Sequence, residues 1–184
     1  MISIRSELMR DITQREALLD GAFGMDRYEK TCERLREGRM PARGLSLIAD
    51  DQGLVVGTVR LWHIAIKVEA ALLLGPLAVA TSHQARGIGG RLMRAALNRA
   101  ASQGYSAIIL VGDKDYYARF GFSTNMTTGI DLPGPVDRHR FLGLELVTGT
   151  LSQQSGMVLP TGDFTGARTR VAAKTRLSPI ARAA

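Results

Sequence analysis

The sequence contains a single cysteine, Cys32, and this scarcity excludes two common ways of stabilising a protein of this size. One cysteine cannot form an internal disulfide, and no cysteine cluster is present to hold zinc. Cys32 lies in a charged segment with no histidine beside it, whereas a reactive thiol needs a partner that lowers its pKa. We therefore expect an idle thiol and no metal site.

Long hydrophobic runs are also missing. No apolar stretch reaches the ~20 residues that span a bilayer. Residues 1–7 include an acid and lack the order of basic region, apolar region and cleavage site that marks a secretory signal. We expect a cytoplasmic protein without a membrane partner. Its 184 residues suffice for one domain with a sizeable core.

Acidic residues are absent from one end of the chain. The formal net charge is +7, and the last twenty residues supply +5 of it through Arg168, Arg170, Lys174, Arg176 and Arg182. The other 164 residues carry only +2, which argues against a nucleic-acid-binding domain. We expect a single domain over residues 1–164 and a basic, solvated or disordered tail over 165–184. Contact between this tail and an acidic partner stays an alternative.

The most informative segment is rich in glycine and lies between an apolar run, 72–79, and a predicted helix. In that helix apolar residues recur at helical spacing, at Ile88, Leu92, Met93, Ala96, Leu97 and Ala100. A strand, a glycine turn and a helix in this order leave the first helical N–H groups unpaired, where they can bind an anion. The segment predicts a phosphate site formed by Gln84, Ala85, Arg86, Gly87, Ile88, Gly89, Gly90 and Arg91.

Two common phosphate motifs are excluded by individual residues. A dinucleotide fingerprint starting at Gly87 needs glycine or alanine at position 92, where the chain has Leu92. A mononucleotide loop needs Gly-Lys followed by Ser or Thr, and that triplet does not occur. The remaining pattern, Gln84-x-x-Gly87-x-Gly89, suits a pyrophosphate bound by backbone N–H groups without a metal.

The rest of the chain alternates between strand and helix patterns. We expect a strand at 1–7, helices at about 11–24 and 25–36, a hairpin of 45–49 with 54–62, a central strand at 70–79, a strand at 107–111, a short helix capped by Asp113 or Asp115, and strands from 122 and at 140–147 and 157–159. The charged segment 25–36 is typical either of a helix that covers a substrate cleft or of a solvated cap. This order indicates a mixed α/β fold with the glycine-rich segment at the end of the central strand.

Residues 74–122 closely resemble the GNAT family of acetyl-CoA-dependent N-acetyltransferases, whose cofactor motif is Q/R-x-x-G-x-G/A. The run 75–79, Gly-Pro-Leu-Ala-Val, is similar to the ligand-facing end of that family's splayed central strand. The run 116–122, Tyr-Tyr-Ala-Arg-Phe-Gly-Phe, is similar to its later aromatic motif. The chain also resembles a bacterial subgroup of predicted acetyltransferases. The resemblance implies an α/β (α+β) fold with a mixed, mainly antiparallel sheet, a splayed central strand and flanking helices.

The resemblance also implies a reaction and the groups that perform it. Acetyl-CoA is the expected co-substrate. Backbone groups of Leu77 and Val79 are expected to bind its pantetheine, and a backbone N–H near Ala78 or Val79 to polarise the thioester oxygen. The Tyr117 hydroxyl is expected to protonate the leaving sulfur, and Tyr116 to serve in packing. We expect a small-molecule or peptide amine as acceptor, no nucleic acid, and a second copy of the chain as a candidate partner in a homodimer.

One functional position departs from the family pattern, because residues 70–81 carry no ionisable side chain to act as a base. We favour ordered water, with Glu69, His63, His83 and His139 as other candidates. The missing carboxylate keeps an alternative open, a non-catalytic acyl-CoA-binding or sensor module. Nucleic-acid binding through the basic tail is a third hypothesis.

Overall fold

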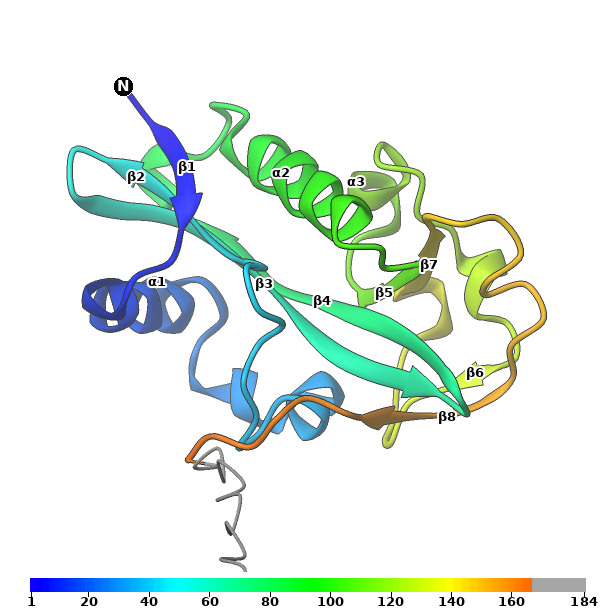
Figure 1. Cartoon of the computed structure of the whole chain (residues 1–184). Coiled ribbons are helices and arrows are strands. Elements are labelled where there is room, and N and C mark those ends of the chain that lie inside the picture. Colours follow the sequence, from blue (N-terminus) through cyan, green and yellow to red (C-terminus); the bar gives the residue numbers. More distant parts are fainter. Residues whose placement is uncertain (167–184) are drawn as a thin grey trace, which may run out of the picture.

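The computed structural model describes residues 1–166, and a twisted β-sheet forms the centre of this part (Figure 1). Its eight strands are β1 (Ser3–Ser6), β2 (Ser46–Asp51), β3 (Leu54–Ile66), β4 (Glu69–Val79), β5 (Ala107–Val111), β6 (Ile130–Asp131), β7 (Phe141–Glu145) and β8 (Gly156–Pro160). The main order is β1-β2-β3-β4-β5-β7, antiparallel except for β4 with β5, while β8 pairs with β3 and β6. The predicted mixed, mainly antiparallel α/β fold is confirmed. The predicted tail, from residue 167 on, lies outside the described residues.

Helices cover both faces of the sheet. The helix α2 (Ile88–Ser102) lies on one face, and α1 (Ile12–Phe23) lies on the other (Figure 1). The predicted apolar stripe of α2 is confirmed, since Leu92, Met93 and Ala96 are fully buried against the sheet. Burial of a side chain as large as leucine contributes about 1.5–3 kcal/mol. This packing fixes the first turn of α2 at the end of β4.

The strand β4 is central, as predicted, and it contains a bulge. Leu61 pairs with Leu74 and Val59 with Leu77, so Gly75 and Pro76 lie together opposite one residue of β3. Gly75 has φ +128°, which glycine adopts without strain, and its carbonyl accepts a hydrogen bond from Trp62 Nε1 at 2.6 Å. Pairing with the parallel strand β5 is confined to Leu72 and Leu73. Beyond the bulge β4 and β5 therefore separate.

The prediction of one continuous helix over 25–36 is wrong. Two short 3-10 helices, η2 (Met25–Glu29) and η3 (Thr31–Leu35), occupy this segment, and extended Lys30 separates them. Leu35 is its only fully buried hydrophobic residue, so little apolar packing is available to stabilise a continuous α-helix.

The strand predicted from residue 122 is also absent from the described chain. Ser123 makes a single bridge to Gly143, and its hydroxyl then accepts the Asn125 N–H to begin η5 (Thr124–Thr127). The Ser123 side chain thus caps a short helix, and the chain turns away from the sheet instead of continuing as a strand. Two further short elements flank the site, η4 (Thr81–His83) and α3 (Lys114–Ala118), and the latter is capped by Asp113 as predicted. Within residues 1–166 no helix is both long and apolar enough to cross a bilayer.

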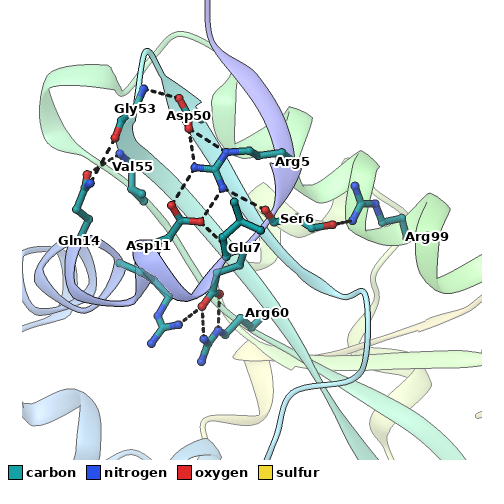
Figure 2. A network of polar contacts seen from close by, with 12 residues as sticks. Arg5, Ser6, Glu7, Asp11, Gln14, Asp50, Gly53, Val55, Arg60 and Arg99 are labelled. Atoms are coloured by element: carbon teal, nitrogen blue, oxygen red, sulfur yellow. Dashed lines mark hydrogen bonds and ion pairs between the residues drawn. The ribbon is translucent and has the colours of Figure 1, made fainter.

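A network of charged residues fastens β1 to α1 and to the β2–β3 hairpin (Figure 2). The Arg5 guanidinium donates to Asp11 and to Asp50, with N–O distances of 2.6 Å to each. Glu7 accepts from Arg60 Nε at 2.9 Å and from Arg15. Asp11 is buried, and its hydrogen bonds with Arg5 hold its pKa at about 2, below the ordinary 3.8.

We predict that Asp11→Asn lowers the free energy of unfolding at neutral pH by about 1–3 kcal/mol, because Arg5 loses a charged acceptor. Since the folded state lowers the pKa of Asp11, its contribution is present above about pH 4 and disappears as the pH falls toward 2. Urea unfolding at several pH values should show the wild-type and variant stabilities converging over that range. Asp26→Asn, at an exposed carboxylate, is the control and should change nothing.

Candidate active site

A cavity of about 1350 Å³ opens where β4 and β5 separate. The end of β4 and the first turn of α2 form one wall, and α3 forms the next. The segment 27–36 and residues 135–140 complete it. Nine of the eleven predicted cofactor-binding residues line this cavity, namely Leu77, Ala78, Val79, Gln84, Ala85, Gly87, Ile88, Gly89 and Gly90. Arg86 and Arg91 do not line it, and Arg91 instead donates to the Ile2 carbonyl at 2.8 Å.

The glycine-rich segment presents backbone donors to this cavity. Gly87 is the N-cap of α2 with φ +73°, and no described side chain caps that N-terminus. Helix geometry leaves the first N–H groups of α2 without intrahelical partners, next to the positive end of the helix dipole. Gln84, Ala85 and Gly87 are exposed. The turn is therefore accessible to an anionic group.

Arg94 also lines this end of the cavity, and it was not among the predicted site residues. It lies one turn after Gly90 on α2, so the two share a helix face. A Cβ placed on Gly90 would lie 3.5 Å from Arg94 Nη1, which puts the guanidinium over the first turn. The i, i+4 spacing from the glycine pair is the signal that would have identified it.

The end of β4 has one unpaired edge. The Ala80 N–H donates to the Val56 carbonyl of β3 at 2.9 Å. Because N–H groups alternate in direction along a strand, Ala78 also faces β3, while Leu77 and Val79 face the cavity. The Val79 carbonyl accepts from Gln84 Nε2 at 3.4 Å, which agrees with this direction. The edge offers backbone groups to an extended ligand that carries amides.

Both tyrosines of α3 line the cavity, in different environments. The Tyr116 hydroxyl lies over Gly89, at 2.6 Å from where a Cβ would be. The Tyr117 ring packs against Gly112 and meets Phe122 edge to face, with centroids 6.0 Å apart. Burial raises the pKa of Tyr117 above its ordinary value of 10, so its hydroxyl remains a proton donor at neutral pH.

The four side chains considered as bases have different locations. Glu69 accepts a hydrogen bond from Ser106 at 3.1 Å at the far end of β4, and His63 contacts Tyr105, with ring centroids 5.7 Å apart. Glu69, His63 and His139 do not line the cavity. His83 does line it, but its ring nitrogens lie 2.8 Å from Ser82 Oγ and 3.3 Å from Asp51 Oδ2.

The cavity wall formed by segment 27–36 and residues 135–140 carries charged side chains that were not among the predicted site residues. They include Arg27, Glu29, Lys30, Glu33 and Arg36 from the segment 27–36, and Asp137 and Arg140 from beyond it. Segment 25–36 was predicted either to cover a cleft or to be a solvated cap, and its residues 27–36 contribute to the cavity wall. Its charge density was visible in the sequence, whereas its position depends on distant contacts.

Cys32 lies on the same wall. Burial raises the pKa of its thiol above the ordinary value, which agrees with the expectation of an idle thiol. Within residues 1–166 no group of three or more His, Cys, Asp or Glu side chains is placed to hold a metal ion.

Comparison with known proteins shows similarity to acetyltransferases. A family model described as an acetyltransferase (GNAT) domain matches residues 42–124. The uncharacterized N-acetyltransferase YhbS of Escherichia coli strain K12 is 29% identical over 157 residues, which are 84% of this chain and 93% of that protein. The uncharacterized N-acetyltransferase YjhQ of the same strain is 31% identical over 105 residues, 55% of this chain and 58% of that protein.

Solved structures are similar over most of the chain. The crystal structure of E. coli YhbS in complex with CoA has 28% identity and a TM-score of 0.74, covering 87% of this chain and 89% of that one. The crystal structure of a GNAT family acetyltransferase from Brucella melitensis in complex with acetyl-CoA has 24% identity and a TM-score of 0.62. That match covers 91% of this chain and 97% of the other, and it supports the fold alone.

We predict that Gly112→Ala displaces the Tyr117 ring, because the new Cβ would overlap Cε2 and lie 2.9 Å from Cδ2. Overpacking of this kind costs about 1–3 kcal/mol of unfolding free energy. Urea unfolding measures this loss. Gly21→Ala in α1 is the control, since no atom lies within 4 Å of its Cβ position and alanine favours a helix. Equal stability of Gly112→Ala and wild type would contradict the described packing.

Proposed function

Because the chain belongs to the GNAT family of acetyltransferases, we propose that it moves the acetyl group of acetyl-CoA to the primary amine of a small molecule or peptide. The amine attacks the thioester directly, through a tetrahedral intermediate. The observation that carries this proposal is the open edge of β4 beside the first turn of α2, with Tyr117 on the facing helix. We place the reaction in the cytoplasm, a reducing compartment that suits a free thiol such as Cys32.

Acetyl-CoA fits this arrangement of donors. The pyrophosphate would accept hydrogen bonds from the N–H groups of residues 87–90, and Arg94 adds positive charge beside them. The pantetheine arm is a chain with two amides, so it can pair with the backbone of Leu77 and Val79 as an added strand. Val79 and Gln84 thus connect the two halves of the cofactor site. We invoke no metal in this binding.

Two groups near the thioester would stabilise the transition state. A tetrahedral oxyanion needs a fixed hydrogen-bond donor. We assign this role to the Leu77 N–H, because the Ala78 N–H points toward β3 and Val79 lies beside Gln84 at the phosphate end. The departing sulfur needs a proton. Tyr117 lines the cavity and is protonated at neutral pH, so we assign it as the general acid. Tyr116, over Gly89, is assigned to packing at the phosphate end.

We predict that the protein releases CoA thiol from acetyl-CoA only when an amine acceptor is present. Tyr117→Phe should lower kcat by roughly 100-fold, because the thiolate then leaves without a positioned proton. Its acetyl-CoA affinity, measured by calorimetry, should stay unchanged. A colorimetric thiol assay over a panel of small amines and peptides measures the turnover.

The control for Tyr117→Phe is Tyr105→Phe, at a tyrosine that lies outside the cavity and contacts His63. A protein that binds acetyl-CoA but releases no thiol with any amine, and that Tyr117→Phe leaves unchanged, would favour the acyl-CoA sensor. Binding to DNA without binding to acetyl-CoA would favour the nucleic-acid hypothesis.

A further inference from the structure

Glu33 lies where the main cavity meets a second, smaller one. The smaller cavity has a volume of about 130 Å³, and four residues line both cavities, Arg27, Glu33, Arg36 and Pro76. Glu33 is the one carboxylate among these four. Pro76 belongs to the bulge that opens β4, directly before Leu77. The Glu33 carboxylate is therefore on the wall that faces the end of β4, where the thioester is expected.

Glu33 is held in place by its own segment. Leu35 of η3 is 1% exposed and packs in the core beneath the sheet. Thr31 Oγ1 donates to the Pro135 carbonyl at 2.5 Å, and Arg34 Nη1 donates to the Pro133 carbonyl at 2.7 Å. Arg36 Nη2 lies 2.9 Å from Glu33 Oε2. These contacts fix the backbone and one carboxylate oxygen, and the other oxygen accepts no hydrogen bond from a residue within 1–166.

The other acidic groups of the cavity have different roles or positions. Asp113 accepts the Tyr116 N–H at 2.7 Å as the cap of α3. Asp137 accepts the His139 N–H at 2.9 Å and caps η6 (Arg138–Arg140). Glu29 is exposed on η2, and it is absent from the junction of the two cavities. Glu33, with 23% of its side chain exposed, is the lining carboxylate that is both fixed and accessible.

We propose that Glu33 is the general base that takes the proton of the attacking amine. This inference rests on the proposed acetyl transfer, in which an amine reaches the enzyme as an ammonium ion and cannot attack until it loses a proton. The central strand lacks a group for this step, since residues 70–81 carry no ionisable side chain. The structure supplies the carboxylate from the opposite wall instead.

The proton and electron transfers balance with Glu33 and Tyr117 alone. One ammonium proton passes to the Glu33 carboxylate, and the nitrogen lone pair forms the C–N bond at the thioester carbon as the carbonyl electrons move to oxygen. When the oxyanion collapses, the C–S bond breaks and the sulfur takes the Tyr117 proton. The second nitrogen proton restores Tyr117. The products are an amide, the CoA thiol and one proton that Glu33 returns to solvent.

The smaller cavity offers a route for that last proton. Glu16, Arg27, Arg36 and Arg60 line it together with Glu33. Arg36 Nε is buried and donates a hydrogen bond to no protein atom among the described residues. A polar chamber of this size can hold bridging water. Glu33 can thus release its proton into the smaller cavity while the acetylated amine is still bound in the larger one.

The test compares Glu33→Gln, Glu33→Asp and the matched control Glu37→Gln, an exposed glutamate one turn further along the chain. With an alkylamine acceptor, Glu33→Gln should lower kcat by roughly 100-fold and Glu33→Asp should restore part of it, while Glu37→Gln matches wild type. Acetyl-CoA affinity should be equal in all four proteins. With a weakly basic amine, already uncharged at the assay pH, the deficit of Glu33→Gln should shrink.

The outcomes separate this inference from the function on which it rests. A wild-type protein that acetylates no amine overturns the proposed function and this inference together. A wild-type protein that turns over, with Glu33→Gln equal to it, overturns the assignment of Glu33 alone. If Glu33→Gln no longer binds acetyl-CoA, Glu33 has a structural role and the proposal fails. The same conclusion follows if the variant loses activity by the same factor with the alkylamine and with the weakly basic amine.

Discussion

The hydrogen bond from Trp62 to the Gly75 carbonyl, at 2.6 Å, fixes the feature on which the site depends. It holds a bulge in which two residues of β4 lie opposite one residue of β3, and Pro76 within the bulge has no N–H to donate. The bulge ends the pairing of β4 with β5 after Leu73. Without that separation the N–H groups of Leu77 and Val79 would be used within the sheet. The Trp62 indole that donates this hydrogen bond is buried in the core. The same side chain therefore contributes to core packing and holds the bulge that leaves the edge of β4 open.

Around this open edge, the two faces of the sheet supply different parts of the chemistry. The α2 face provides backbone donors and Arg94, which suit the anionic end of acetyl-CoA. The opposite face provides a wall of charged side chains from segment 27–36. Arg27 on that wall donates a hydrogen bond to Glu16, which also accepts from Arg15. Arg15 in turn donates to Glu7, a member of the charged network shown in Figure 2. The charged network of β1 and α1 thus continues to the acceptor side of the cavity and helps to position it.

The cofactor half of the site could be predicted from the sequence, because its signals are local. Glycine spacing, the apolar run before it and the stripe of α2 all lie within thirty consecutive residues, 72–101, and the predicted central strand and helix are confirmed. The acceptor half could not be predicted in the same way. Thr31 is fixed by Pro135, 104 residues away, and Arg34 by Pro133, 99 residues away. Helical spacing in 25–36 suggested one α-helix, but these distant contacts and the single buried Leu35 produced two short turns. Glu33 was therefore not visible as a site residue.

Amide hydrogen exchange, measured with and without acetyl-CoA, tests the central claim that the open end of β4 and the first turn of α2 form one cofactor site. We predict slower exchange at Leu77 and Val79 and at residues 87–90 when acetyl-CoA is present, because bound amides exchange only after the ligand leaves. Ala78, whose N–H faces β3, should change little by comparison. Unchanged exchange at Leu77 and Val79 under saturating acetyl-CoA, or protection confined to other parts of the chain, would contradict the account.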